Sequence, residues 1–232
     1  MRRGRGRLMS SFQRIYDLAA ERKGGAEALE ALIAPHRPKT REEIATAPAD
    51  RWLAAMTRFV FIAGFRWRVI DAKWPGFEAA FWGFDPNRCA MISDEDMDAL
   101  LKDTRIVRNG QKISSVGPNA RFLLELACEH GSAGRFFADW PDEDFVGLLE
   151  VLKARASRLG GESAMRFLRM MGKPSFITSR DVTAALIREG VLEKPPSGKR
   201  DLHKVQAAFN AWAAESGRDL TSISRTLALS TG

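Results

Sequence analysis

Residues Leu152–Met171 read LKARASRLGGESAMRFLRMM, in which two runs of helix-forming residues flank a pair of glycines. Apolar residues recur at helical spacing on both sides of the pair. Gly160 and Gly161 allow positive φ angles and let the backbone lie close to a partner. The stretch therefore predicts a helix, a glycine turn and a second helix, and free N–H groups at such a turn can hold a phosphate. An ordinary tight corner between two packed helices gives the same pattern.

The charge of the chain gathers around this stretch. Lys and Arg number 36 against 29 Asp and Glu, for a formal net charge of +7. Residues 1–150 carry equal numbers of basic and acidic side chains, so the whole excess lies in residues 151–232. Residues 151–180 hold seven bases and one acid, Glu162. A basic stripe this local indicates a polyanionic partner, although a solvated helix face would also account for it.

The rest of the chain has the periodicity of helices. No segment alternates as a strand does, so we expect an all-α fold. The apolar spacing and the Gly and Pro breaks predict helices at about residues 11–23, 26–33, 50–73, 118–130, 142–155, 162–171, 179–190, 199–216 and 219–229. Phe77, Phe81 and Phe84 mark a further helix, and Ser93 followed by three acids is typical of a capped helix start. We expect residues 1–10 to be a flexible basic arm and residues 11–232 to form one helical domain, with two lobes as an alternative.

Several classes of protein are excluded by composition. No apolar run approaches the roughly 20 residues that a membrane span requires, and the basic start is not followed by the apolar block of a secretory signal. Two cysteines, Cys89 and Cys128, are too few for a disulfide scaffold or an all-cysteine zinc site. We therefore expect a protein of the reducing cytoplasm.

Asp181 stands at the expected start of the helix that follows this stretch. With it, the sequence resembles the helix-hairpin-helix DNA glycosylase superfamily, in which a glycine hairpin grips DNA and an aspartate farther along the chain serves the flipped nucleotide. Gly161 matches the last glycine of that hairpin, whereas Leu159 stands in place of the first. Ser163 occupies the position of the lysine nucleophile of the bifunctional members, so the chain is similar to the monofunctional ones.

A second set of motifs narrows the resemblance. Residues 63–126 are similar to the DNA-3-methyladenine glycosylase I family in several separate segments that occur in order. The matching segments are Ala63–Trp67, Phe77–Pro86, Asp103–Asn109, Lys112–Ile113 and Asn119–Arg121. The alignment continues through Leu152–Met171 and covers about half of the chain. It implies a helix-hairpin-helix, glycosylase-like helical bundle with the hairpin at residues 152–171.

The resemblance also implies roles for individual residues. Trp67 matches a tryptophan of the family's base pocket, and Phe59 stands where the family has a base-recognising glutamate, so we expect both to contact the base. The family's terminal zinc site pairs Cys with His, and this sequence has no matching cysteines. We expect no metal and no cofactor. The residues expected to contact DNA are Arg158, Gly160, Gly161, Ser163 and Arg166.

Asp181 is the expected catalytic residue. Its carboxylate would stabilise the positive charge that develops on the sugar as the glycosidic bond breaks, and could orient or deprotonate the attacking water. Because Asp181 follows Ser179 at a helix start, it could instead serve only as a helix cap.

These observations predict a monofunctional DNA glycosylase that excises alkylated purines such as 3-methyladenine in base excision repair. The expected partner is double-stranded DNA, bound by a monomer, and no membrane is involved. Two alternatives remain: a non-catalytic DNA-binding relative, favoured by Phe59 in place of the glutamate, and a glycosylase for another damaged base.

Overall fold

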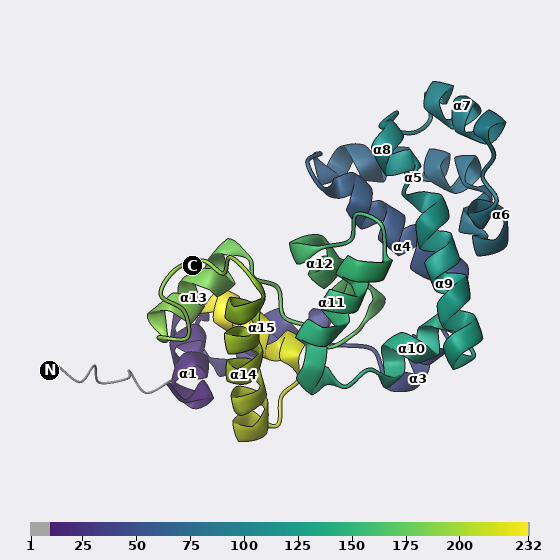
Figure 1. Ribbon diagram of the computed structural model, residues 1–232. Coiled ribbons are helices and arrows are strands. Elements are labelled where there is room, and N and C mark those ends of the chain that lie inside the picture. Colours follow the sequence, from purple (N-terminus) through teal and green to yellow (C-terminus); the bar gives the residue numbers. More distant parts are fainter. Residues whose placement is uncertain (1–9, 232) are drawn as a thin grey trace, which may run out of the picture. The chain divides into compact units, whose positions relative to one another are not determined.

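The structure, a computed structural model, describes residues 10–231 and is built from helices joined by short turns (Figure 1). No strand occurs within that range, which confirms the all-α prediction. None of the helices described there is long and apolar enough to cross a membrane. The predicted basic arm lies outside the described residues, except for Ser10.

The chain divides into two compact units. Unit 1 comprises residues 1–38, 141–146 and 174–232, and unit 2 comprises residues 39–140 and 147–173. The helices of unit 1 are α1 (Phe12–Lys23), α2 (Ala26–Ile33), η1 (Ala34–His36), η3 (Asp142–Asp144), α13 (Arg180–Arg188), α14 (Lys199–Ser216) and α15 (Leu220–Leu229). The remaining helices are α3 (Arg41–Ala45), α4 (Ala49–Ile62), α5 (Trp67–Ala80), η2 (Trp82–Phe84), α6 (Pro86–Ala90), α7 (Asp94–Lys102), α8 (Gly110–Ile113), α9 (Val116–His130), α10 (Ala133–Asp139), α11 (Phe145–Arg155) and α12 (Gly161–Met171).

Helix α4 is the centre of unit 2. Helices α5, α9, α10 and α12 all pack against it (Figure 1). Its Trp52 is fully buried and stacks on Phe137, with ring centroids 4.3 Å apart, while Phe167 meets the Trp52 ring edge-on at 5.8 Å. Burial of a large apolar side chain stabilises a fold by about 1.5–3 kcal/mol. These three rings therefore fix α4, α10 and α12 as a rigid base for the turns described below.

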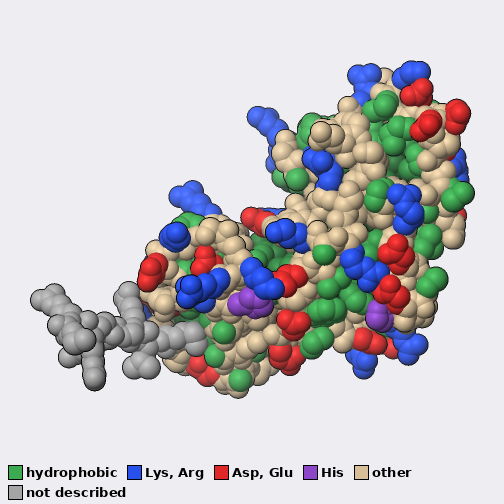
Figure 2. All heavy atoms as spheres, in the orientation of Figure 1, with side chains coloured by type: hydrophobic (Ala, Val, Ile, Leu, Met, Phe, Trp, Pro, Cys, Tyr) green, Lys and Arg blue, Asp and Glu red, His purple; other side chains and the backbone are tan. Residues whose placement is uncertain are grey.

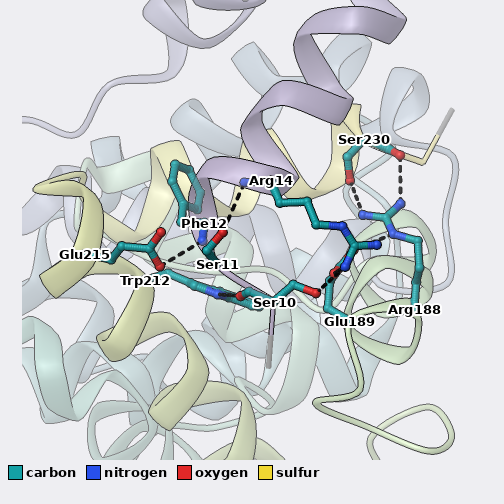
Figure 3. Close-up of polar contacts among 9 residues, drawn as sticks. All are labelled: Ser10, Ser11, Phe12, Arg14, Arg188, Glu189, Trp212, Glu215 and Ser230. Carbon is teal, nitrogen blue, oxygen red and sulfur yellow. Dashed lines mark hydrogen bonds and ion pairs between the residues drawn. The ribbon is translucent and has the colours of Figure 1, made fainter. Parts of the chain in front are cut away.

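Unit 1 has its own aromatic core and a polar cluster that fixes the start of the described chain. The rings of Phe176, Phe209 and Trp212 pack in sequence within the core. The indole Nε1 of Trp212 donates to the Ser10 carbonyl at 3.0 Å (Figure 3). The carboxylate of Glu215 accepts from the Phe12 N–H at 2.9 Å. Helix α1 is thereby held to α14 at its first turn.

The polar cluster continues to a buried carboxylate. Glu189 has a side chain that is only 2% exposed, and its Oε1 accepts from the Arg188 Nε at 2.5 Å. The Arg14 guanidinium lies 4.0 Å from the other carboxylate oxygen and donates to the Ser10 hydroxyl at 2.8 Å. Arg188 also donates to the carbonyl and hydroxyl oxygens of Ser230, each at 2.8 Å (Figure 3). We call Ser10, Arg14, Arg188, Glu189 and Ser230 the N-terminal anchor.

One predicted helix is divided in the structure. The expectation of a continuous helix over residues 50–73 was wrong, because α4 ends at Ile62 and α5 begins at Trp67. Gly64 adopts a φ of +78°, a conformation that an α-helix does not contain, and the Phe65 N–H donates to the Ile62 carbonyl at 2.9 Å in a tight turn. The break places residues 63–66 at a turn where the prediction had a helix interior.

Candidate nucleic-acid interface

The glycine turn predicted at Gly160 and Gly161 is present, between α11 and α12. Arg158 and Gly161 have φ angles of +61° and +57°, so the backbone is left-handed at both ends of the turn. Leu159 between them is buried, with 1% of its surface exposed, and Gly160 and Gly161 are exposed. Leu159 thus anchors the turn in the core while both glycines face solvent.

A buried amide fixes the approach to this turn. Asn119 on α9 is fully buried, and its Oδ1 accepts from the Ser157 N–H at 2.7 Å. Its Nδ2 donates to the Ser157 carbonyl at 3.1 Å. Both backbone groups of Ser157 are therefore satisfied by one side chain, and the residue before Arg158 cannot rotate without breaking the pair of bonds. The α11–α12 turn is a positioned turn and not a free loop.

The outer side of the turn is open. A Cβ placed on Gly161 would meet nothing within 4 Å, and one on Gly160 would meet only the Cγ of Lys153 at 4.0 Å. Helix α12 begins without a side-chain cap, because its N-cap residue is Gly160. The first N–H groups of a helix have no partner within the helix, and the helix dipole favours an anion there. The predicted DNA contacts Gly160, Gly161 and Ser163 all lie at this end.

The basic stripe of residues 151–180 separates into paired and unpaired side chains. Arg155 bonds Glu129 at 2.7 Å and 3.0 Å, and Arg166 pairs with Glu162 one helical turn earlier. Lys173 is buried and donates to the Trp140 carbonyl. Exposed Lys153 and Arg158 have no hydrogen bond or ion pair among the described residues. On the face drawn in Figure 2, basic and acidic side chains are accordingly interspersed.

The second turn of interest joins α4 to α5 and exposes aromatic side chains. Trp67, the first residue of α5, is 58% exposed, and Phe65 in the turn is 41% exposed. Arg66 and Arg68 are exposed beside them, and the Arg68 guanidinium lies 5.6 Å from the centroid of the Trp67 ring. Phe59 is half-buried on the last turn of α4. Trp67 is thus a surface residue, not a core aromatic.

Lys112 lies beneath the α4–α5 turn. It is 6% exposed, and its Nζ donates to the Phe61 carbonyl at 3.0 Å and to the Ala63 carbonyl. The ammonium group also lies 4.5 Å from the centroid of the Phe65 ring. Burial lowers the pKa of Lys112, and the positive charge of Arg158 lowers it further. The charge of Arg158, in the α11–α12 turn, therefore acts on the ammonium group that bonds the α4–α5 turn. We call residues 63–68 and 157–161 the two-turn face.

Asp181 belongs to unit 1, whereas the other predicted site residues belong to unit 2. It is exposed in the first turn of α13, and the hydroxyl of Ser179 caps that helix by accepting from the Val182 N–H. Within residues 10–231 the Asp181 carboxylate makes no hydrogen bond or ion pair. The capping role is thus filled by Ser179, and the carboxylate is available to a ligand.

A cavity of about 570 Å³ in unit 2 lies among α3, α4, α5 and the end of α12. Its lining includes Arg51, Arg58, Trp74 and Met170, but neither Trp67 nor Phe59. The Arg51 guanidinium is already bonded to the Glu78 carboxylate at 2.8 Å and 3.0 Å. Arg58 pairs with Asp71. The cavity is therefore distinct from the predicted base-contact residues.

The described residues do not offer the ligands of a zinc site. The described residues contain no group of three or more His, Cys, Asp or Glu side chains placed to hold a metal ion. Cys89 is buried, donates to the Phe81 carbonyl at 3.3 Å, and has a pKa raised to about 12 by burial. A thiol with so high a pKa is a poor metal ligand, because the thiolate is the form that binds.

Lys112 and Asn119 bond to the backbone of the two turns, and sequence reasoning did not assign either residue to the site. Both fall inside motifs that resemble the family, so the signal was present as a segment match. The sequence did not indicate which way these two side chains point, because neither residue type shows by itself whether it faces the core. A lysine beside Ile113 and an asparagine beside Ala120 both look like solvent-facing positions of amphipathic helices.

The all-helical fold is similar to that of a solved DNA glycosylase. The structure has a TM-score of 0.51 to 3-methyladenine DNA glycosylase I from Staphylococcus aureus, solved in a study of how that protein recognises 3-methyladenine. The match covers 68% of this chain and 91% of that chain at 19% sequence identity, so it shows the fold alone.

Sequence comparison matches part of the chain to one family. Residues 51–148 match the family described as methyladenine glycosylase, which confirms the resemblance. The chain is 34% identical over 64 residues to DNA-3-methyladenine glycosylase 1 of Escherichia coli, covering 28% of this chain and 34% of that protein. It is 27% identical over 78 residues to DNA-3-methyladenine glycosylase of Haemophilus influenzae, covering 34% and 40%. The chain thus spans well under half the length of these curated relatives.

Proposed function

We propose that this protein is a monofunctional DNA glycosylase that excises alkylated purines such as 3-methyladenine from double-stranded DNA, acting as a monomer. The observation that carries the proposal is the two-turn face, which combines an open glycine turn with an exposed aromatic turn on a fold similar to that of a solved glycosylase. The relatives of the sequence are DNA-3-methyladenine glycosylases, which supports the same reaction.

The α11–α12 turn supplies the DNA contacts. A phosphate oxygen can approach Gly160 and Gly161 without steric conflict, and the uncapped N–H groups at the start of α12 point toward it. Arg158 adds an unpaired positive charge at the same place. Ser163 follows in the first turn of the helix, whereas Arg166 contributes less because Glu162 neutralises it. These contacts are sequence-independent, as removal of damage at any position requires.

The α4–α5 turn supplies the base contacts. A glycosylase must turn its target out of the duplex, and the extruded base stacks on aromatic or apolar side chains. Trp67 presents the exposed ring for this stacking, and half-buried Phe59 lies on the last turn of α4. An alkylated purine carries positive charge, so an aromatic face attracts it more strongly than it attracts a normal base.

Asp181 supplies the charge for bond cleavage. As the glycosidic bond lengthens, positive charge develops on the sugar, and an ionised carboxylate stabilises it electrostatically. The same carboxylate orients or deprotonates the attacking water. A base alkylated on the ring is already a good leaving group, so little acid catalysis is needed. The absence of any described partner for the Asp181 carboxylate is consistent with this role.

Phe59 favours a second candidate function. A phenyl ring cannot accept the hydrogen bonds that a glutamate at this position would accept, so discrimination of the base is weaker. A protein with the same two turns and no base release would be a DNA-binding relative of the glycosylases. Release of a different damaged base would assign another substrate to the same site.

One experiment separates these outcomes. Duplex DNA treated with a methylating agent is incubated with the protein, and each released base is quantified by mass spectrometry. We expect release of methylated purines by the wild type, a loss of at least about 100-fold in Asp181→Asn, and nearly unchanged duplex binding. The matched control is Asp94→Asn, an exposed aspartate in the first turn of α7. Binding without release by the wild type would support the non-catalytic function, and equal release by Asp181→Asn would remove Asp181 from the mechanism.

A further inference from the structure

We propose that Lys112 is a positioning residue, which holds the α4–α5 turn in the arrangement that leaves Phe65 and Trp67 exposed. The role in base release rests on the proposed function, whereas the role in holding the turn does not. Lys112 does not touch the base or the DNA in this proposal, because it is 6% exposed and lies under the ring of Phe65.

The bonds of Lys112 are directed at the point where α4 ends. The carbonyls of Phe61 and Ala63 lie at the C-terminal end of that helix, where carbonyl oxygens have no partner within the helix. One ammonium group joins these two oxygens on either side of Ile62. Loss of the ammonium group would free both carbonyls and allow the backbone from Ala63 onward to change direction.

No carboxylate of the described residues pairs with Lys112. Its charge is held by the two carbonyls, by the negative end of the α4 dipole and by the faces of Phe65 and Phe61, whose centroids are 4.5 Å and 5.9 Å away. Carbonyls and rings are directional, unlike a mobile counter-ion, so the bound lysine specifies one arrangement of the turn. Phe65 in particular is held over the ammonium group.

The helices that flank the turn are joined independently of Lys112. Arg58 on α4 pairs with Asp71 on α5, and the Arg58 guanidinium lies 5.2 Å from the centroid of the Trp74 ring. Removal of Lys112 therefore leaves α4 and α5 connected and affects the turn between them. The positive charge of Arg158 contributes to the lowered pKa of Lys112, and Lys112→Met removes that repulsion as well.

The test uses a spectroscopic probe and three variants. The full chain is labelled with 5-fluorotryptophan, and the fluorine resonance of Trp67 is assigned with Trp67→Phe; the other five tryptophans serve as internal references. Lys112→Met removes the donors at similar volume, and Lys112→Arg retains donors and charge. The matched control is Lys102→Met, an exposed lysine at the end of α7.

The expected result has a structural part and a kinetic part. In Lys112→Met the Trp67 resonance shifts or broadens while the five references stay in place, and Lys112→Arg restores it. Single-turnover base release falls by about tenfold or more in Lys112→Met, since small misplacements of a reacting group have effects of this order, with a much smaller change in the dissociation constant for duplex DNA. Lys102→Met changes neither.

Other outcomes are equally decisive. An unshifted Trp67 resonance in folded Lys112→Met would overturn the proposal, as would a shift that Lys112→Arg does not reverse. If Lys112→Met does not fold, Lys112→Gln provides the same comparison with one weaker donor. If the wild type releases no base, the proposed function fails, while the Trp67 resonance still decides whether Lys112 holds the turn.

Discussion

Glu189 in the N-terminal anchor and Lys112 beneath the two-turn face are both buried, charged side chains. The surroundings of Glu189 favour its charged form, whereas those of Lys112 disfavour it. Burial raises the pKa of Glu189, but hydrogen bonds from Ser10 and Arg188 and the charges of Arg188 and Arg14 outweigh burial and leave that pKa lowered. Lys112 also has a lowered pKa, because burial and the charge of Arg158 both disfavour its charged form. The anchor thus stabilises the charged carboxylate of Glu189, whereas keeping the Lys112 ammonium group charged beneath the two-turn face costs free energy.

The difference indicates which charged residues stabilise the fold and which are available for binding. Salt bridges with several partners, such as Glu189 with Arg188 and Arg14, fix structure. Unpaired cations such as Lys153 and Arg158 gain an opposite charge only from a partner molecule. The excess of positive charge in residues 151–232 is therefore less informative than the location of those few bases that lack an acid.

The largest effect on stability is expected from a substitution that disrupts the N-terminal anchor. Glu189→Gln removes the charge that Arg188 and Arg14 share and leaves a buried amide with mismatched partners, so we expect the free energy of unfolding to fall by about 2–4 kcal/mol. Urea denaturation followed by circular dichroism measures it. Glu193→Gln, an exposed glutamate nearby in sequence, is the control and should change stability by less than about 0.5 kcal/mol. Equal effects of the two variants would contradict a structural role for the anchor.

The next largest effect is expected from a substitution that loosens the α11–α12 turn without changing any charge. Asn119→Ala removes both bonds to Ser157 and leaves its backbone groups unpaired, so the expected loss of unfolding free energy is about 1–3 kcal/mol. Because Ser157 precedes Arg158, duplex binding should weaken as well. Asn87→Ala on the exposed surface of α6 provides the control. Weakened stability with unchanged duplex binding would show that the turn does not contact DNA.

Much of the fold was predictable from the sequence because its signals are local. The glycine pair at residues 160–161 predicted the α11–α12 turn, and Ser93 followed by acids predicted the capped start of α7, which has a complete capping box. The break at residues 63–66 carried a local signal too, since Gly64 is the residue type that ends helices, but the apolar run on both sides of it outweighed that signal.

The parts that could not be predicted depend on contacts between distant segments. Nothing near Glu189 in the sequence indicates that Ser10 and Arg14 will approach it. Arg166 is a different case, because its partner Glu162 lies one turn earlier on the same helix and the sequence itself contained the signal for this pair. The assignment of Asp181 as the catalytic residue stays a prediction, and its exposed position in α13 is compatible with it.

A smaller effect, on the salt dependence of duplex binding, distinguishes paired from unpaired bases near the α11–α12 turn. Arg158→Gln should reduce the slope of log K against log salt for duplex binding by about 0.9, the value for one lost phosphate contact. Arg166→Gln should reduce it less, because Glu162 already neutralises that guanidinium. Binding titrations at several salt concentrations provide both slopes. Identical reductions would mean that the Glu162–Arg166 pair opens when DNA binds.

The smallest effect compares the two buried charges directly through pH. The pKa of Glu189 lies below its ordinary 4.5 in the folded protein, so its contribution is present above that value and is lost as the pH falls through the folded pKa. The pKa of Lys112 lies below its ordinary 10.5, so the charged amine costs stability at neutral pH, and the cost disappears as the pH rises from the folded pKa toward 10.5.

In both cases the unfolded chain binds more protons than the folded chain, so stability rises with pH, but in separate windows. Unfolding free energies measured across the acid and alkaline ranges should show the acid rise reduced in Glu189→Gln alone and the alkaline rise reduced in Lys112→Met alone. An alkaline rise that survives in Lys112→Met would mean that Lys112 is not a desolvated charge. The contrast between a stabilised carboxylate and a penalised ammonium would then disappear, and only the bonds to the two carbonyls would remain to explain why a lysine lies there.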